Sequence, residues 1–348
     1  MNSKRHFLLH PVVWLAALGY FVDIYDLLLF SIIRIPSLND LGVSDLTGTG
    51  LLILNTQMFG LLLGGILWGV LGDKLGRTRV LFYSITLYSI GNLLNGFVQT
   101  GTQYAIIRFI AGIGLAGELG AGITLVSELL PKNKRGIGTS LVAGFGLTGV
   151  VLAFFIAQWF PWRICYFIGG GMGLLLLTLR MSVFESSLYK KLALKNHVTK
   201  GNFLMLFNKK ERFVRYIRTT LIGLPTWFVV GILISFSPEF AYHLGIEQSI
   251  DPGKGIMISY AAIAIGDVAI GILSNRLKSR KKALHIFYLI TIIGMTVFFT
   301  ATTPWQLYLS TGIMGFGTGF WAVFVTIGAE NFGTNLRATA ATTIPNMV

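Results

Sequence analysis

Several ionisable side chains stand inside long apolar stretches of this sequence, where they could carry protons or bind a polar solute. An ionisable group at the centre of a bilayer costs about 2.5–3.5 kcal/mol on insertion scales, so each one is a candidate functional residue. A carboxylate in such a place can bind and release a proton, and a nearby opposite charge stabilises its ionised form. The residues with this placement are Asp23, Asp26, Arg108, Glu118 and Asp267.

Asp26 and Arg108 belong to different apolar stretches but are predicted to lie at similar depths. If both stretches cross a membrane as helices, a rise of about 1.5 Å per residue puts Asp26 about 6 Å and Arg108 about 10 Å to the outer side of the midplane. We therefore expect both side chains to face a central cavity within reach of each other. Arg108 would stabilise ionised Asp26, whereas separation and desolvation would favour protonation and so couple a proton to solute movement. A structural ion pair without a proton role is the alternative.

The other three candidates each allow more than one role. Asp23 lies three residues before Asp26 on the same broad face, so it could share the proton, contact a solute or have only a structural role. Glu118 is predicted near the midplane, where it could contact solute or proton or serve only in helix packing. For Asp267 we favour an ion pair with a neighbouring basic loop, which would gate the helix, over solute contact.

Helices that cross a membrane must position these residues. Hydrophobic residues make up 53% of the 348 residues and charged residues only 12%, with a mean hydropathy of +0.70, which leaves too few polar side chains to cover a soluble globule. A spanning helix needs about 20 apolar residues. The predicted spans of this all-α membrane protein are 11–33, 48–71, 80–99, 103–127, 138–160, 164–184, 216–240, 255–275, 283–301 and 305–329, with an eleventh beginning near 338.

The basic residues predict the orientation of these spans. The sequence has 28 Lys and Arg and a net charge of +14. Arg108 lies in a span and only Arg34, Arg163 and Lys254 fall in loops of one side, so the remaining 24 fall on the other. Cytoplasmic loops carry such an excess, which predicts a multi-pass protein of the inner (plasma) membrane with a cytoplasmic N-terminus. The charge is spread between spans, so we expect no binding to nucleic acid.

Two pairs of loops indicate an internal repeat. Residues 69–79 align with 271–281, and residues 128–136 align with 330–338, both at an offset of 202. Because two separate loops agree on one register, we expect two six-helix bundles in parallel orientation, related by an axis along the membrane normal.

The repeat divides the chain into two bundles. Residues 1–184 form the first, residues 185–215 are a long basic linker on the cytoplasmic side, and residues 216–348 form the second. The chain stops about ten residues into the predicted eleventh span, so we expect the second bundle to be incomplete.

The loop after the second span resembles the signature of the major facilitator superfamily, in which glycines alternate with an acid and paired bases. The stretches from Arg108 to Gly114 and around Glu118 are similar to the fourth helix in that family, and Phe184-Glu185-Ser186 resembles an element of its sugar and metabolite porters. In proton-coupled sugar porters an Asp of the first helix and an Arg of the fourth occupy the places of Asp26 and Arg108. The signature residues are Gly69, Asp73, Lys74, Gly76, Arg77 and Arg79.

The resemblance implies that the signature loop holds one access state at the cytoplasmic mouth. Asp73 could cap a helix or pair with an Arg of the other bundle. Glu128 with Arg135, and Glu330 with Arg337, resemble further latches of this kind. Ordinary surface ion pairs, which contribute about 0–1 kcal/mol each, are the alternative for these two pairs.

The predicted function is secondary transport of an organic acid, a sugar or a zwitterion by alternating access, as proton symport. The alternatives are a uniporter or antiporter of the same fold, or a membrane sensor that transports nothing. The five His are scattered and no phosphate-binding loop is visible, so we expect neither an enzyme nor a cofactor. Expected partners are the solute, protons and the lipid bilayer, and we expect a monomer.

Overall fold

A computed structural model gives the structure of residues 11–75, 77–118, 142–184 and 207–321, and of 323, 324, 327, 331, 332, 340 and 343–348. The side chains at 72–74, 77–78, 182–184 and 275 are outside this description, as are those of Pro11 and Val12. Within these limits all regular structure is helical. Seven helices are long and apolar enough to cross a membrane.

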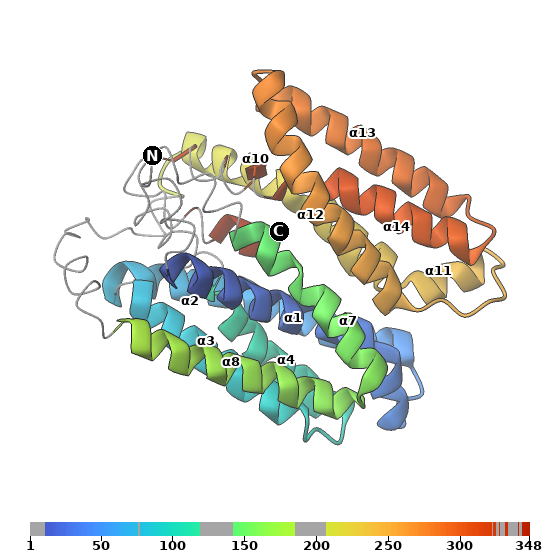
Figure 1. Ribbon diagram of the computed structural model, residues 1–348, viewed down its shortest axis with the longest axis horizontal. Helices are drawn as coiled ribbons and strands as arrows, with labels where there is room; N and C mark the ends of the chain where they lie inside the picture. Colours follow the sequence, from blue (N-terminus) through green and yellow to red (C-terminus); the bar gives the residue numbers. More distant parts are fainter. Residues whose placement is uncertain are drawn as a thin grey trace, which may run out of the picture.

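The helices lie in two groups that meet along α1, α7 and α12 (Figure 1). In the N-terminal group, α1 packs against α7 and α8, α2 packs against α4, and α3 packs against α4 and α8. In the C-terminal group, α12 and α13 both pack on α14. The N-terminal group comprises α1 (Pro11–Asp40), α2 (Leu46–Leu75), α3 (Arg77–Asn95), α4 (Gly101–Leu115), α7 (Gly149–Trp159) and α8 (Trp162–Phe184). The C-terminal group comprises α10 (Lys210–Trp227), η3 (Phe228–Ile234), α11 (Ser237–His243), α12 (Pro252–Arg276), α13 (Arg280–Phe299) and α14 (Pro304–Thr318).

The first helix is longer than the sequence predicts. The predicted span ends at residue 33 because Arg34 was assigned to an outer loop, but α1 continues to Asp40 through Arg34 and Pro36. Arg34 is buried. A buried arginine in a helix requires a partner, and its partner lies in the C-terminal group, as described below.

The predicted span 216–240 is divided into three pieces. α10 ends at Trp227, the next seven residues form the π-helix η3, and α11 begins at Ser237. Pro225 lies in the last turn of α10 and removes a backbone donor there, while Pro238 is favoured in the first turn of α11. Local π-helical turns often occur at functional sites, and this one borders the central cavity.

Close glycine contacts recur in the two groups at an offset of 202 or 203 residues. A side chain on Gly112 would meet the backbone of Gln57, and one on Gly315 would meet the backbone of Ser259. Two further contact pairs repeat in the same way. A side chain on Gly114 would meet Tyr88, as one on Gly317 would meet Thr291. A side chain on Gly91 would meet Ala111, as one on Gly294 would meet Met314.

The starts of α4 and α14 are also alike. Thr100 and Thr303, 203 residues apart, each accept a hydrogen bond from the backbone N–H of a Gln three residues later. Each Gln side chain in turn accepts from the backbone N–H of the residue before the Thr, so the two helix starts share one reciprocal capping pattern. The recurrence supports an internal repeat, although the alignment of 69–79 with 271–281 itself stays a prediction.

Candidate functional site

Arg108 lies at the centre of a buried polar cluster inside the N-terminal group. Its Nε donates to Oε1 of Gln57 at 3.1 Å, its Nη1 to Oδ1 of Asn92 at 3.2 Å and its Nη2 to the backbone carbonyl of Asp26 at 2.9 Å. The guanidinium also lies 5.6 Å from the ring centre of Tyr166. The side chain is fully buried, so α1, α2, α3 and α8 together supply the polar surroundings that its charge requires.

Asp26 contacts Arg108 through its backbone rather than its carboxylate. Neither carboxylate oxygen has a hydrogen-bond partner among the described residues, and Oδ1 lies against Gly169 of α8. Neither Asp26 nor Arg108 is among the described residues that line the central cavity, and their role in proton coupling stays a prediction. Gln57 and Asn92 provide neutral acceptors that hold the guanidinium within the group.

Glu118 forms a buried ion pair with Arg180 of α8. Arg180 Nη1 donates to Glu118 Oε2 at 2.9 Å, its Nη2 pairs with Oε1, and Nη2 also donates to the backbone carbonyl of Leu15 at 3.3 Å. The pair packs against Gly19 of α1, where a side chain would collide with both groups. The prediction that counts Arg180 among the basic loop residues is therefore wrong, because Arg180 is 1% exposed and neutralises Glu118.

Asp23 is the predicted residue that does reach the central cavity. It is buried, and among the described residues its Oδ1 has no hydrogen-bond partner. It is electrostatically coupled to Glu118, to Asp26 and to Arg180. Asp23 therefore interacts with the buried charges of the N-terminal group and also borders the central cavity between the two groups.

The central cavity has a volume of about 380 Å³ and is bordered by both groups. Volumes of roughly 300–1,000 Å³ are typical of small-molecule sites. Asp23 is the only carboxylate among its described lining residues, which include no Lys, Arg or His. The rings of Trp227 and Trp321 meet edge to face at 6.4 Å on the C-terminal side. The polar and aromatic lining includes Tyr20, Asp23, Asn55, Trp227, Tyr260 and Trp321.

An ion pair joins the two groups at one end of the cavity. Arg34 Nη1 lies 2.7 Å from Glu239 Oε1, and Nη2 donates to Oε2 at 3.0 Å and to the backbone carbonyl of Ser235 at 3.3 Å. The guanidinium also stacks 4.3 Å from the ring centre of Phe236. Thr47, at the start of α2, donates to Glu239 Oε1 at 3.3 Å. We call Arg34 and Glu239 the outer pair.

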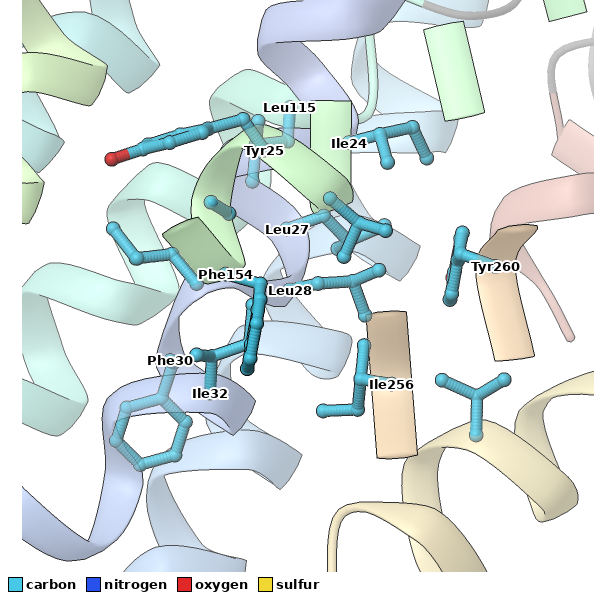
Figure 2. Packing of buried hydrophobic residues seen from close by; sticks show 14 of the residues in the cluster. Ile24, Tyr25, Leu27, Leu28, Phe30, Ile32, Leu115, Phe154, Ile256 and Tyr260 are labelled. Carbon is cyan, nitrogen blue, oxygen red and sulfur yellow. The ribbon is translucent and has the colours of Figure 1, made fainter. Parts of the chain in front are cut away.

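Apolar side chains also join the two groups, in addition to the outer pair. Figure 2 shows Leu28 and Ile32 of α1 with Phe154 of α7 and Ile256 of α12 in one buried cluster. Nearby, Gln158 Nε2 donates to Asp251 Oδ2 at 3.2 Å, again from one group to the other.

Residues 345–348 also border the cavity. Asn346 donates from Nδ2 to the backbone carbonyl of Ala116 at 3.0 Å, and its side chain packs on Gly65. Thr343 lies against Gly69, so this member of the predicted signature sits at a contact between distant parts of the chain.

The remaining signature residues are only partly described. Among them, Arg79 is exposed. Asp267, a separate candidate outside the signature, is half-buried on α12 close to Gly319, and its ion pair with a basic loop stays a prediction. The side chains of Asp73, Lys74 and Arg77 lie outside the described residues. So do Gly76, Glu128, Arg135, Glu330 and Arg337, and the two predicted latches therefore stay predictions.

Sequence reasoning missed Arg34 and Arg180 as site residues. Both are single basic residues close to the ends of apolar runs, and the predicted span 164–184 contains Arg180. A charge inside a predicted span was the available signal for Arg180, with Glu118 as the natural partner. For Arg34 no comparable signal exists, because Glu239 is 205 residues away.

The sequence model of the Major Facilitator Superfamily matches residues 16–344. The putative niacin/nicotinamide transporter NiaP of Bacillus subtilis is 27% identical over 99% of this chain and 86% of its own length. The sialic acid transporter NanX of Escherichia coli is 34% identical over 64% of this chain and 55% of its own length.

Solved structures show the same fold. The xylose transporter XylE from E. coli, in a partially occluded inward open conformation, superposes with a TM-score of 0.73 at 18% identity. The match covers 98% of this chain and 89% of that one. With a family match over nearly its whole length, the chain belongs to the Major Facilitator Superfamily and is a multi-pass membrane transporter of small molecules, not an enzyme.

Proposed function

We propose that this protein is a proton symporter of a small organic acid and that it works by alternating access. The observation that carries the proposal is the placement of Asp23, a buried acid whose Oδ1 lacks a hydrogen-bond partner among the described residues and which borders the cavity between the groups. Substrates of this fold bind near the midplane between its two repeats.

The charge in the cavity gives the physical reason for coupling. A substrate carboxylate beside ionised Asp23 would be repelled strongly in a low-dielectric site. One proton shared between them removes the repulsion and forms a hydrogen bond. Substrate and proton would then bind together, which is the requirement for symport. Names of relatives agree with this substrate class, because niacin, sialic acid and benzoate are all carboxylic acids.

The ring-rich wall favours acids that carry a ring. Trp227 and Trp321 present aromatic faces and edges that can pack on a flat substrate, while Tyr20 and Asn55 offer hydrogen bonds. A sugar would need more polar partners than the described lining provides, so we place sugars second.

Alternating access requires contacts that form at one end while those at the other break. The outer pair and the contact of Gln158 with Asp251 join the groups at one end, and Asn346 on Ala116 does so at the other. We propose that residues 1–184 and 216–348 move against each other as two parallel repeats, with 185–215 as the linker. Gly69 and the signature loop would contribute to the cytoplasmic contact.

We also propose that the N-terminus is cytoplasmic. Removing the buried Arg34 and Arg180 from the loop residues leaves 23 basic residues on the proposed cytoplasmic side, against Arg163 and Lys254 on the other. The bias thus survives the corrections, and it agrees with the positive-inside rule.

The test is uptake into proteoliposomes that hold the full-length protein. Labelled nicotinate, benzoate, sialic acid and xylose would be offered with and without an inward proton gradient. Accumulation of at least one acid that collapses when the gradient is dissipated is the expected result. Uptake of an acid that equilibrates at the same rate with or without the gradient would indicate a uniporter and overturn the coupling.

A further inference from the structure

A second cavity, of about 870 Å³, lies at the basic end of the C-terminal group, where α10 and α13 begin. Five cationic side chains line it, against one carboxylate, that of Glu211. All five are exposed. They are Lys210, Arg215 and Arg218 of α10 and Arg280 and Lys281 of α13.

The backbone adds to this positive potential. Two helices point their N-termini toward the cavity, and the positive ends of helix dipoles favour anions. No side chain caps the start of α10 at Lys209. The preceding residues 185–206 add four lysines and one acid, Glu185, so this neighbouring segment is also basic.

The walls of the cavity are held by hydrogen bonds. Arg215 Nη1 donates to the backbone carbonyl of Asn331 at 3.0 Å, and Asn331 Nδ2 donates to Thr219 Oγ1 at 3.2 Å. Tyr288 of α13 donates to the backbone carbonyl of Ile222 of α10 at 2.9 Å. The cations are therefore carried by a framework in which α10, α13 and residue 331 are fixed relative to one another.

Apolar surface begins directly beyond the cations. α10 has no acidic or basic side chain after Arg218, and α13 has only His285 after Lys282. Large apolar side chains are exposed on both helices in these stretches. They include Leu221 and Leu224 on α10 and Ile286, Leu289 and Ile293 on α13.

We propose that this cavity binds the phosphate headgroup of an anionic phospholipid, with its acyl chains along the apolar faces of α10 and α13. Along both helices the cations come first and the exposed apolar side chains follow. A phospholipid has the same order, with a charged headgroup followed by apolar acyl chains. A soluble phosphate would use the cations but gain nothing from the apolar surface. Basic pockets between membrane helices on the cytoplasmic side are known to bind anionic headgroups.

The test measures lipid retention by the purified full-length protein. Native mass spectrometry would follow phosphatidylglycerol, with phosphatidylcholine as the neutral lipid of similar chain length. The double variant Arg218→Gln with Lys281→Gln should retain phosphatidylglycerol about tenfold less well, because each basic residue near an anionic lipid contributes to binding. Phosphatidylcholine binding should not change.

A matched control separates the cavity from general attraction by a basic surface. Arg276→Gln with Lys282→Gln removes the same charge from exposed positions at the same end, but neither residue lines the cavity. Equal loss of lipid in both double variants would overturn the proposal in favour of diffuse electrostatics. Displacement of the lipid by millimolar inorganic phosphate would also overturn it, by identifying a site for a soluble anion.

Discussion

Arg34 of α1 and Glu239 of α11 form an ion pair of 2.7 Å although they are 205 residues apart. Arg34 is 1% exposed, and its other hydrogen bonds go to backbone carbonyls, one in each group of helices. Glu239 is the residue that neutralises it. A buried charge that loses its partner is strongly destabilising, so the outer pair should favour the state in which this end is closed.

Glu239→Gln should shift the protein toward the state that is open at this end. Arg34 would lose its counter-charge while keeping its backbone contacts, so the closed state loses most from the substitution. The readout is labelling of Leu27→Cys, a cavity position, by an impermeant maleimide added from outside. Cys165 is the only native cysteine and would be replaced by Ser. The labelling rate should rise severalfold in the Glu239→Gln background.

Asp40 provides the matched control for that experiment. It pairs with Arg163 at 3.4 Å within the N-terminal group, and both side chains are partly exposed. Exposed pairs contribute about 0–1 kcal/mol, so Asp40→Asn should leave the labelling rate unchanged. An equal increase in both variants would show that the outer pair has no special part in closing this end.

Glu118 and Arg180 should behave as one buried unit. Either single variant, Glu118→Gln or Arg180→Gln, leaves a buried charge unpaired and should cost about 3–5 kcal/mol. The double variant keeps hydrogen-bonding groups without either charge, so it should be more stable than at least one single variant. Thermal unfolding in detergent measures this double-mutant cycle. Additive losses would mean that the two side chains are not coupled.

Glycine contacts at matching positions should respond alike. Gly112→Ala and Gly315→Ala both place a methyl group against the backbone of a neighbouring helix, and such overpacking costs about 1–3 kcal/mol. At Gly171 nothing lies within 4 Å of an added methyl group, so Gly171→Ala should be neutral or slightly stabilising. Tm measurements compare the three variants. Loss of stability at only one of the two matching positions would argue against equivalent packing in the two groups.

The sequence predicted those features of the fold that depend on local composition. The positions of the apolar runs follow from hydropathy, and seven described helices meet the criteria for a span. Asp23, Asp26, Arg108 and Glu118 were found because a charged residue inside an apolar run is visible without any structure. All four are buried.

The pairing of these charges could not be predicted, because it depends on side-chain directions and distant partners. Depth alone predicts that Asp26 pairs with Arg108, but Gln57 and Asn92 accept from the guanidinium and the one hydrogen bond from Arg108 to Asp26 goes to its backbone carbonyl. Arg180 was counted with the basic loops because it lies near the end of its helix. The break between α10 and α11 has a cue in Pro225 and Pro238, but the π-helical turn between them has none.

Asp23 and Asp26 should differ when each is changed to Asn in proteoliposomes that show uphill uptake. Asp23 borders the cavity and is proposed to share the proton with substrate, so Asp23→Asn should abolish accumulation driven by a proton gradient. Exchange between substrate pools on the two sides needs only the loaded carrier to reorient. It should survive, because Asn resembles the protonated acid. Asp26→Asn keeps the backbone carbonyl that accepts from Arg108. If Asp26 serves only to balance the charge of Arg108, the Asp26→Asn protein should therefore retain some uphill uptake.

The reverse pattern would move the proton to the buried cluster. If Asp26→Asn abolished uphill uptake but not exchange, while Asp23→Asn left accumulation intact, Asp26 would be the proton carrier and Asp23 a lining residue. A structural role predicts a third pattern, since an unbalanced Arg108 lowers the folded yield and reduces accumulation and exchange together. Measuring both transport modes per unit of folded protein, as judged by size-exclusion chromatography, therefore separates the carrier from the residue that only stabilises the fold.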